Sequence, residues 1–455
     1  MKGTRSSVAK LEWPEAMQKS SRRRWAIWTA GVLAHTVGTF HRAAMAPMAD
    51  RVMADFGISA AVFGSLGAAY FYVYAAMQLP SGTLADTIGP RKTITGGLLL
   101  STLGSVIMGV APSFAIVYTG RLVVSLGVSI VWLSVVKLIM GWFRSRELAT
   151  MTGLSISVAN LGQLAAATPL ALLVIWVGWR MSFVGVAALS LALAVVNWFT
   201  IQGSAAQAGP SMGVGLNQRR NARAGLARDS LGLSLVRRFG VVFGNGQFWV
   251  LSLVGLGTYG AYSTLLHHWG VLYLMQTQGV ARDFAGNFLL VSTIGLMLGA
   301  PLLGFLSDRI FKKRRFPLIL FTALSLISFL LLALWNGGRP PLETLYPLCF
   351  VMGLTTGTVF ITFACVGDIA QPSVRGVATG LVNTGGFVGA AVGQVVFGHI
   401  LDLGWEGEMA EGARVYPAAA FQHGLLLCCI LAGLGLVAAL LVKETHCRES
   451  YGAET

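Results

Sequence analysis

The chain has 455 residues, of which 55% are hydrophobic and only 11% are charged, and its mean hydropathy is +0.69. Soluble globular proteins carry about 25% charged residues, so this composition argues against an ordinary soluble protein. The five cysteines, of which Cys428 and Cys429 are adjacent, have neither the spacing of a disulfide framework nor that of a metal site. We therefore expect a membrane protein without a bound metal or other cofactor.

Twelve apolar stretches follow one another along the chain. A bilayer core of about 30 Å needs roughly 20 apolar residues per helix, and each stretch approaches or exceeds that length. Most are apolar all round and are interrupted by Gly and Ser, which is typical of helices that pack closely in lipid. The fold class is thus an all-α polytopic membrane protein. The expected spans are 25–49, 61–83, 93–110, 114–141, 148–175, 181–201, 247–275, 285–306, 316–336, 344–366, 376–401 and 419–442.

The positive charges indicate how the chain is oriented. The formal net charge is +15, and most of the 33 Lys and Arg residues fall in the tails and loops on one side of the twelve spans. Because cytoplasmic loops carry an excess of Lys and Arg, both termini are expected in the cytoplasm. The basic excess is then a signal of topology, and nucleic acid is not an expected partner.

The chain divides into two halves that resemble each other. Gly82-Thr-Leu-Ala-Asp86 recurs as Gly304-Phe-Leu-Ser-Asp308, and Arg146-Glu-Leu-Ala-Thr150 recurs as Arg375-Gly-Val-Ala-Thr379. Internal duplication of this kind is typical of secondary transporters, whose substrate site lies between the repeats near the bilayer midplane. The expected parts are a cytoplasmic tail (1–24), a six-helix bundle (25–201), a cytoplasmic connector (202–246), a second six-helix bundle (247–442) and a cytoplasmic tail (443–455).

Two motifs resemble those of the major facilitator superfamily. The stretch Gly82-Thr-Leu-Ala-Asp86-Thr-Ile-Gly89-Pro-Arg91-Lys92 resembles its loop signature, and Arg121-Leu-Val-Val-Ser125-Leu-Gly127 resembles its R-x-x-x-G-x-G motif, with Ser125 in place of the first Gly. The resemblance implies two pseudo-symmetric six-helix bundles that rock to expose a central site alternately on either side.

In that family the loop signature is usually interpreted as a gate, in which the Asp carboxylate caps a helix N-terminus and pairs with a cytoplasmic Arg. The alternative is that these residues only fix the loops. The expected gating residues are Gly82, Asp86, Gly89, Arg91, Arg146, Gly304, Asp308, Arg309 and Arg375.

Three basic residues fall inside the spans, namely Arg42, Arg121 and Lys137, whereas Asp and Glu are found only near span ends. Ionisable groups in a membrane interior usually mark function, and cations without compensating acids should attract an anion. Arg42 is the favoured ligand. For Arg121 a helix-packing role is the alternative, and Lys137 is expected to extend to the membrane interface.

Other polar side chains share helical faces with these cations. His35 lies on the face of Arg42, and Tyr259, Ser263 and His267 share a face of the seventh span. Histidine titrates near neutral pH, so His267 or His268 could carry a coupling proton, or could only bond neighbouring backbone or lipid headgroups. The candidate substrate-binding residues are Arg42, Arg121, His35, Tyr70, Tyr74, Tyr259, Ser263, His267, Asn160 and Asn383.

The segment His41-Arg42-Ala-Ala-Met45-Ala-Pro47 resembles the first helix of the anion:cation symporter and organophosphate antiporter branches, in which an Arg commonly contacts an anionic substrate. Ser263 stands where the phosphate antiporters have a second Arg, so a two-Arg phosphate clamp is in doubt. A Walker A motif is absent from the sequence, which argues against a nucleotide-hydrolysing enzyme.

These observations predict a secondary active transporter that moves a small organic anion by alternating access, with a carboxylate as one candidate and a proton as the coupling ion. We expect a multi-pass monomer in the plasma membrane, which is the inner membrane in a Gram-negative bacterium. The alternatives are a proton-driven exporter of amphiphilic, drug-like compounds and a transporter-like solute receptor.

Overall fold

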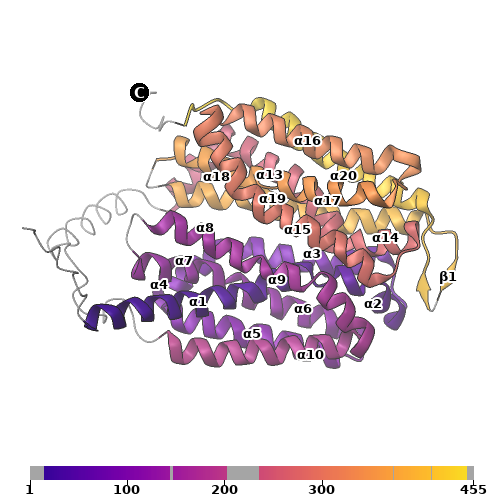
Figure 1. Ribbon diagram of the computed structural model, residues 1–455, viewed down its shortest axis with the longest axis horizontal. Helices are drawn as coiled ribbons and strands as arrows, with labels where there is room; N and C mark the ends of the chain where they lie inside the picture. The colour runs from indigo at the N-terminus through magenta and orange to yellow at the C-terminus, as the bar shows by residue number, and fades with distance from the viewer. Residues whose placement is uncertain (1–14, 144–146, 202–234, 372–373, 411, 448–455) are drawn as a thin grey trace, which may run out of the picture.

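The computed structural model of the chain describes residues 15–143, 147–201, 235–371, 374–410 and 412–447. Its two helical halves lie side by side in Figure 1, the first half below and the second half above. The short strands β1 (Met409–Ala410) and β2 (Ala413–Arg414) pair antiparallel, with Met409 opposite Arg414, at one end of the bundle. The first helix begins and the last helix ends at the opposite end, which we call the connector end.

The first half consists of helices whose breaks fall within the expected spans. Its elements are α1 (Glu15–Ala43), the 3-10 turn η1 (Ala46–Met48), α2 (Ala49–Phe56), α3 (Ala60–Ala76), α4 (Gln78–Thr87), α5 (Pro90–Val110), α6 (Phe114–Ser129), α7 (Val131–Trp142), α8 (Leu148–Ala159), α9 (Leu161–Ala165) and α10 (Thr168–Thr200).

The second half repeats this pattern and contains two π-helical turns, η3 and η4. Its elements are α12 (Leu235–Gly244), α13 (Gly246–Thr264), η3 (Leu265–Trp269), α14 (Gly270–Gln278), α15 (Arg282–Phe305), η4 (Leu306–Phe311), α16 (Arg315–Leu334), the 3-10 turn η5 (Trp335–Gly337), α17 (Leu342–Thr355), α18 (Thr358–Ile369), α19 (Arg375–Leu403) and α20 (Ala418–Leu441).

Eight helical segments of the described chain are long and apolar enough to cross a membrane. One of them, Met151–Thr200, contains two expected spans joined at Gly178, whose φ of 79° bends the chain, so the eight segments account for nine spans. The other three are interrupted or less apolar: α1 carries polar residues, α3 has 17 residues, and the π-helix η3 interrupts the seventh span. The number of apolar segments in the described chain is therefore lower than the expected twelve for two reasons: two spans are joined in one segment, and three spans are interrupted, short or partly polar.

The first described helix extends beyond the first expected span towards the N-terminus. Helix α1 begins at Glu15, whereas the tail was expected to extend to residue 24. A helix can continue past the apolar region because Lys, Arg and Glu are good helix formers, so hydropathy marks the membrane boundary and not the end of the helix.

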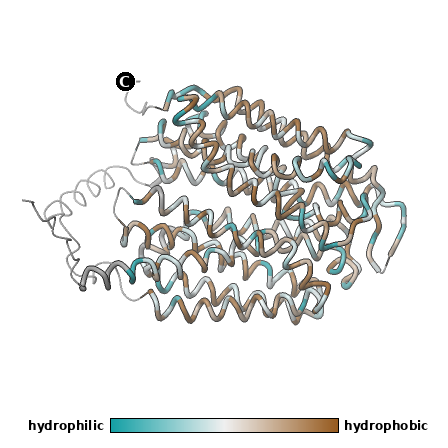
Figure 2. The backbone as a smooth tube through the Cα atoms, viewed as in Figure 1, coloured by the Kyte–Doolittle hydropathy of each residue, from teal (hydrophilic) through white to brown (hydrophobic). Residues whose placement is uncertain are grey.

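The surface of the bundle matches a lipid environment. Large apolar side chains are exposed along the helices, including Trp176 at 75% and Phe199 at 67% of their full accessible area. Figure 2 shows hydrophobic residues along the length of the helices and more hydrophilic residues towards the two ends. Such a surface would be costly in water and is favourable in lipid.

Helices α3 and α19 form a close seam between the two halves. At Gly64 of α3, an added Cβ atom would lie only 2.5 Å from the carbonyl oxygen of Gln394 in α19, so the backbones approach as closely as a glycine permits. Near the start of the seam, the backbone N–H groups of Ala60 and Ala61 donate to the Asp402 carboxylate at 3.0 and 2.8 Å. This carboxylate supplies acceptors for the first, otherwise unpaired N–H groups of α3.

Candidate functional site

Arg42 lies between the two halves, near the end of α1. Its guanidinium carbon is 5.7 Å from the ring centroid of Tyr74 in α3 and 6.0 Å from that of Phe387 in α19. The two rings themselves meet edge to face with centroids 4.8 Å apart. Arg42 keeps some accessible surface although its neighbours in α1, His41 and Ala43, are buried. The expected anion ligand is thus an accessible cation bordered by aromatic rings from both halves.

Tyr259 of α13 faces the same guanidinium from the second half. Its ring centroid is 6.2 Å from that of Phe387, and its buried hydroxyl lies near Arg42 and Ser263 without a well-aligned hydrogen bond to either. The Nε of Arg42 is likewise buried and unpartnered among the described residues. Buried polar groups are normally well hydrogen-bonded, so the imperfect bonding of Arg42 and Tyr259 leaves donor capacity for a ligand or water.

A chain of hydrogen bonds joins the two halves next to this group. The Gln163 amide nitrogen donates to Asn160 Oδ1 at 2.9 Å, Gln163 Oε1 lies 2.8 Å from His267 Nε2, and His267 Nδ1 lies 3.1 Å from the Ser263 hydroxyl. Because a glutamine carbonyl oxygen can only accept, His267 Nε2 carries the proton and Nδ1 accepts from Ser263. The imidazole of the second half is therefore bound directly to the first half.

The π-helix η3 places His267 and His268 side by side in the interior. His268 stacks on Phe63 of α3, with ring centroids 4.5 Å apart. It fits there because position 67 is glycine: an added Cβ would lie 2.4 Å from the His268 ring and 2.3 Å from Gln394 Oε1. π-helical turns are rare and frequently occur at functional sites.

Arg121 occupies a different environment from Arg42. It is fully buried, its NH1 group donates to the His41 carbonyl at 2.8 Å, and its guanidinium covers the Tyr70 ring at 4.9 Å. The Tyr70 hydroxyl in turn donates to the Gly38 carbonyl at 2.9 Å. These contacts tie α6 and α3 to α1, and they favour the helix-packing alternative for Arg121.

The remaining candidate residues surround the Arg42 group at greater distance. His35 packs on Trp132 of α7 with ring centroids 4.8 Å apart and lies in electrostatic range of Arg42. Asn383 is half-buried on α19, one helical turn before Phe387 and therefore on the same face. Phe387 was not among the predicted residues, whereas Gln163 was expected as a polar contact beside Asn160. In the sequence, Phe387 could have been found from its position four residues after Asn383, which places both residues on one face of a helix.

The expected gating residues are only partly described. Arg146 and the side chain of Asp86 lie outside the described residues, as does position 82 beyond its backbone. Gly89 has a φ of 87° and precedes the first turn of α5, which is a conformation that favours glycine. Arg91 stacks on Trp198 at 4.1 Å. In the second half, an added Cβ at Gly304 would meet no atom within 4 Å, and Arg309 is exposed.

A charged cluster surrounds Arg314 at the connector end of the second half. Its guanidinium pairs with Asp308 and donates to Asp368 at 3.0 Å, so the partner found for Asp308 lies in its own loop. Burial opposes the charge, but the hydrogen bonds to Asp368 and Asp308 outweigh it and raise the Arg314 pKa above its ordinary value. Arg375 donates to the Gly367 carbonyl at 2.8 Å.

The end remote from the connector is closed by contacts between the halves. Arg282, at the start of α15, forms an ion pair with Asp50 of α2 and donates to the Pro47 carbonyl. The Thr168 hydroxyl donates to Asn287 Oδ1 at 2.7 Å. We call Asp50, Arg282 and the Asp402 carboxylate the distal clamp.

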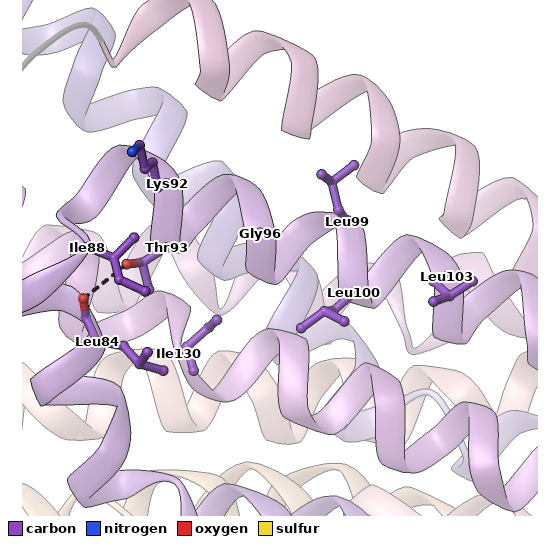
Figure 3. A pocket seen from close by; sticks show the side chains of 9 residues that line it. All are labelled: Leu84, Ile88, Lys92, Thr93, Gly96, Leu99, Leu100, Leu103 and Ile130. Atoms are coloured by element: carbon purple, nitrogen blue, oxygen red, sulfur yellow. Dashed lines mark hydrogen bonds between the residues drawn. The ribbon is translucent and has the colours of Figure 1, made fainter.

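A groove of about 430 Å³ runs along the outside of α5 and is a different kind of cavity (Figure 3). Leu99 and Leu103 line it and are 47% and 53% exposed, Lys92 lies at one end, and the Thr93 hydroxyl donates to the Leu84 carbonyl at 3.5 Å. It shares no residue with the Arg42 group and faces the side where lipid would lie. Within the described residues, no group of three or more His, Cys, Asp or Glu side chains could hold a metal ion.

Two helical halves around an interior cation, with lipid-matched outer surfaces, define a multi-pass membrane transport protein. The sequence model described as Major Facilitator Superfamily matches residues 28–279 and again 268–451, and the chain belongs to this family. It is a transporter and not an enzyme.

Individual proteins agree with this assignment. The chain is 26% identical over 440 residues to a probable sulfoacetate transporter of Cupriavidus necator, covering 94% of this chain and 95% of that one. It is 23% identical to a D-galactonate transporter of Escherichia coli, covering 93% and 99%. Among solved structures, a bacterial homologue of the human lysosomal transporter Spinster, inward-facing and unoccupied, aligns with a TM-score of 0.70 at 18% identity, covering 92% and 97%.

Proposed function

We propose that the protein is a secondary active transporter of a small organic anion, with a carboxylate as the first class to test, and that Arg42 is the main ligand of the anion. The observation that carries the proposal is the position of Arg42: accessible, between the halves, and against the rings of Tyr74 and Phe387. A cation in a membrane interior is costly unless it has a partner or a function. An anionic substrate would supply the partner.

The substrates for which the two relatives are named support an organic anion as the substrate. Sulfoacetate and D-galactonate are both small organic anions, and the relatives named for them align with nearly the whole chain. At 26% and 23% identity they support the charge of the substrate more than its identity. Sulfoacetate has two anionic groups and galactonate has one, so the two compounds differ in a property that can be tested.

We further propose that a proton accompanies the anion and that His267 carries it. His267 is bound to Gln163 of the first half and lies in electrostatic range of Arg42. A proton added at Nδ1 would reverse the hydrogen bond with Ser263, since that hydroxyl would then accept. The added positive charge beside Arg42 is favourable only when an anion is bound, and this mutual dependence would couple the two fluxes.

The proposed transporter has both termini in the cytoplasm and functions as a monomer. With the connector end in the cytoplasm, the distal clamp would close the outer side of the transporter. The site lies within one chain, which supports a monomer as the functional unit. The proposed cytoplasmic parts are the tails 1–24 and 443–455 and the connector 202–246, with bundles at 25–201 and 247–442.

The test is a binding and transport panel on purified protein. Sulfoacetate, galactonate, benzoate and the lipophilic cation tetraphenylphosphonium are compared for thermal stabilisation, which reports binding to the folded state. Anions that stabilise the protein, with loss of the effect in Arg42→Gln, support the proposal. The exposed Arg339 provides the matched control Arg339→Gln, which should behave like the original protein.

Stabilisation by tetraphenylphosphonium that survives Arg42→Gln would overturn the proposal in favour of an exporter of amphiphilic compounds. Uptake into proteoliposomes with and without an imposed pH gradient then tests the coupling. If His267→Gln abolishes the dependence on the gradient but retains exchange of anion for anion, the proton assignment is supported. If gradient-driven uptake is unchanged in that variant, the assignment is wrong.

A further inference from the structure

We propose that the Arg42 site selects organic anions with a single negative charge and a planar apolar body, and that it discriminates against dianions and phosphate esters. This inference rests on the proposed function and deepens it by naming the substrate class. It follows from the number of cations at the site, from the shape of its walls and from the donors that lack a well-aligned hydrogen bond.

The first step is the count of positive charge. Arg42 is the one Lys or Arg whose described contacts include the rings of both Tyr74 and Phe387. Arg121 is fully buried behind Tyr70 and already donates to the His41 carbonyl. Arg282 is paired with Asp50 in the distal clamp. A monoanion would therefore be neutralised at this site by a single guanidinium.

The second step is the cost of a further charge. Two negative charges at one cation leave one charge without a partner in a setting of aromatic rings, where desolvation is expensive. A phosphate ester carries close to two negative charges at neutral pH and is best held by more than one Arg. A proton on His267 would neutralise part of the second negative charge of a dianion. That proton would then be needed for binding, and a dianion and its proton would together carry a net charge of −1 across the membrane.

Aromatic side chains from both halves form the walls around Arg42. Tyr74 stacks on Tyr70 with centroids 5.8 Å apart, and it meets Phe387 edge to face at 4.8 Å. Phe387 is in turn 6.2 Å from Tyr259, with their rings at 82°. Aromatic faces and edges favour contact with a flat hydrocarbon, while the tyrosine hydroxyls remain for the charged end of the ligand.

The fourth step is the pair of open donors. Arg42 Nε and the Tyr259 hydroxyl are both buried without a well-aligned hydrogen bond among the described residues, and both can donate to a carboxylate. Tyr259 faces the guanidinium, so one carboxylate would bring both donors into use. The body of the same ligand would then extend along Phe387 towards Asn383, which lies one turn away on α19.

The experiment compares probes that differ in one property each. Benzoate is the planar monoanion, terephthalate adds a second carboxylate to the same ring, phenyl phosphate replaces the carboxylate, cyclohexanecarboxylate removes planarity, propionate removes the ring and benzamide removes the charge. Dissociation constants are measured on the purified full-length protein at neutral pH. We expect benzoate to bind at least about tenfold more tightly than terephthalate, phenyl phosphate and benzamide, and about threefold more tightly than cyclohexanecarboxylate.

Variants of Phe387 test the wall. Phe387→Leu should weaken benzoate binding by about three- to tenfold and change propionate binding by less than about twofold, while Phe387→Tyr should retain benzoate binding. Phe284, which is 39% exposed on the outer surface, gives the matched control Phe284→Leu. Size-exclusion profiles and melting temperatures confirm that each variant is folded.

The outcomes separate this inference from the function on which it rests. Equal or tighter binding of terephthalate or phenyl phosphate, with binding still dependent on Arg42, would overturn the single-charge selection and leave anion transport in place. An unchanged benzoate affinity in Phe387→Leu would overturn the assignment of the wall. Binding of benzamide as tightly as benzoate would overturn both the inference and the proposed function. If none of these charged probes binds but galactonate or sulfoacetate binds in a manner that depends on Arg42, only the inference is overturned.

Discussion

Arg42 and Arg121 lie in the same half of the molecule, and both are positive charges in a membrane interior, yet their surroundings differ. Arg121 has no accessible surface and donates to the His41 carbonyl across the α1–α6 contact. Arg42 keeps accessible surface between rings from both halves, although the Nε atoms of both arginines lack a described partner. A charge held by the protein's own groups stabilises a helix contact, whereas a charge left accessible is available to a ligand. The environment, and not the residue type, separates the two roles.

Removal of the Arg42 charge is expected to give the largest change in function. Arg42→Gln should lower anion binding and uptake by at least about 100-fold, which corresponds to about 2.7 kcal/mol, because the anion would lose the guanidinium proposed to bind it. The melting temperature should change less than in the Arg121 variant, since the described contacts of Arg42 with α3 and α19 are to aromatic rings and leave no buried carbonyl without its donor. Uptake of radiolabelled anion and thermal unfolding of the same preparation provide the two measurements. A large loss of stability with unchanged affinity would reverse the roles assigned to the two arginines.

The matched change at Arg121 should act on stability instead. Arg121→Met is expected to destabilise the protein by about 1–3 kcal/mol, because the His41 carbonyl would remain buried without its donor. Thermal unfolding in detergent measures this effect, with Arg42→Gln as the comparison. The protein that remains folded should bind the anion with nearly the original affinity. A selective loss of binding in a fully stable Arg121 variant would place Arg121 in the substrate site.

The distal clamp tests the same difference between a paired and an accessible arginine, because its Arg282 already forms an ion pair with Asp50 of the other half. Asp50→Asn leaves Arg282 buried beside a neutral partner and should weaken closure of that end, with a several-fold change in the rate of anion exchange. The exchanged pair Asp50→Arg with Arg282→Asp should restore part of the rate, since the attraction is retained in reverse. Failure of the exchanged pair to recover any activity, despite correct folding, would show that the ion pair is not what closes this end.

The smallest effect is expected at Glu444, which lies outside the spans. Burial opposes its ionisation, but backbone N–H groups of Arg314, His446 and Arg315 hold its pKa below the ordinary value. A lowered pKa in the folded state stabilises the protein above the ordinary pKa, and the stabilisation is lost as the pH falls through the lowered value. Glu444→Gln should therefore cost about 0.5–1 kcal/mol at neutral pH and little in acid, measured as the difference in melting temperature. An equal difference at both pH values would contradict the charge as its cause.

Much of the fold could be predicted from the sequence because lipid imposes a simple rule on helix length and hydropathy. The family, the two halves and the membrane location are confirmed. Helix interruptions such as η3 and the bend at Gly178 could not be predicted, since hydropathy does not report backbone geometry.

The site was predictable where charge was the signal and not where packing was. Arg42 is conspicuous in the sequence as a cation in an apolar span. Phe387 is one of 24 phenylalanines, and only the fold brings it to Arg42. Gln163 and His267 are 104 positions apart, so their hydrogen bond depends on how the two halves dock. The roles of these residues remain predictions until the variants are measured.

The seam between α3 and α19 has a consequence for the rate of the transport cycle. Where Gly64 meets the backbone of Gln394, there is no side chain to interlock with the opposite helix. Interdigitated side chains resist sliding because each must leave its socket before it finds another, whereas smooth backbones exchange one set of contacts for a similar set at little cost. At this contact the two helices can therefore shift against each other at little cost in packing energy and without opening a gap. A slower step is expected where side chains of the same two helices interlock, as Tyr74 and Phe387 do.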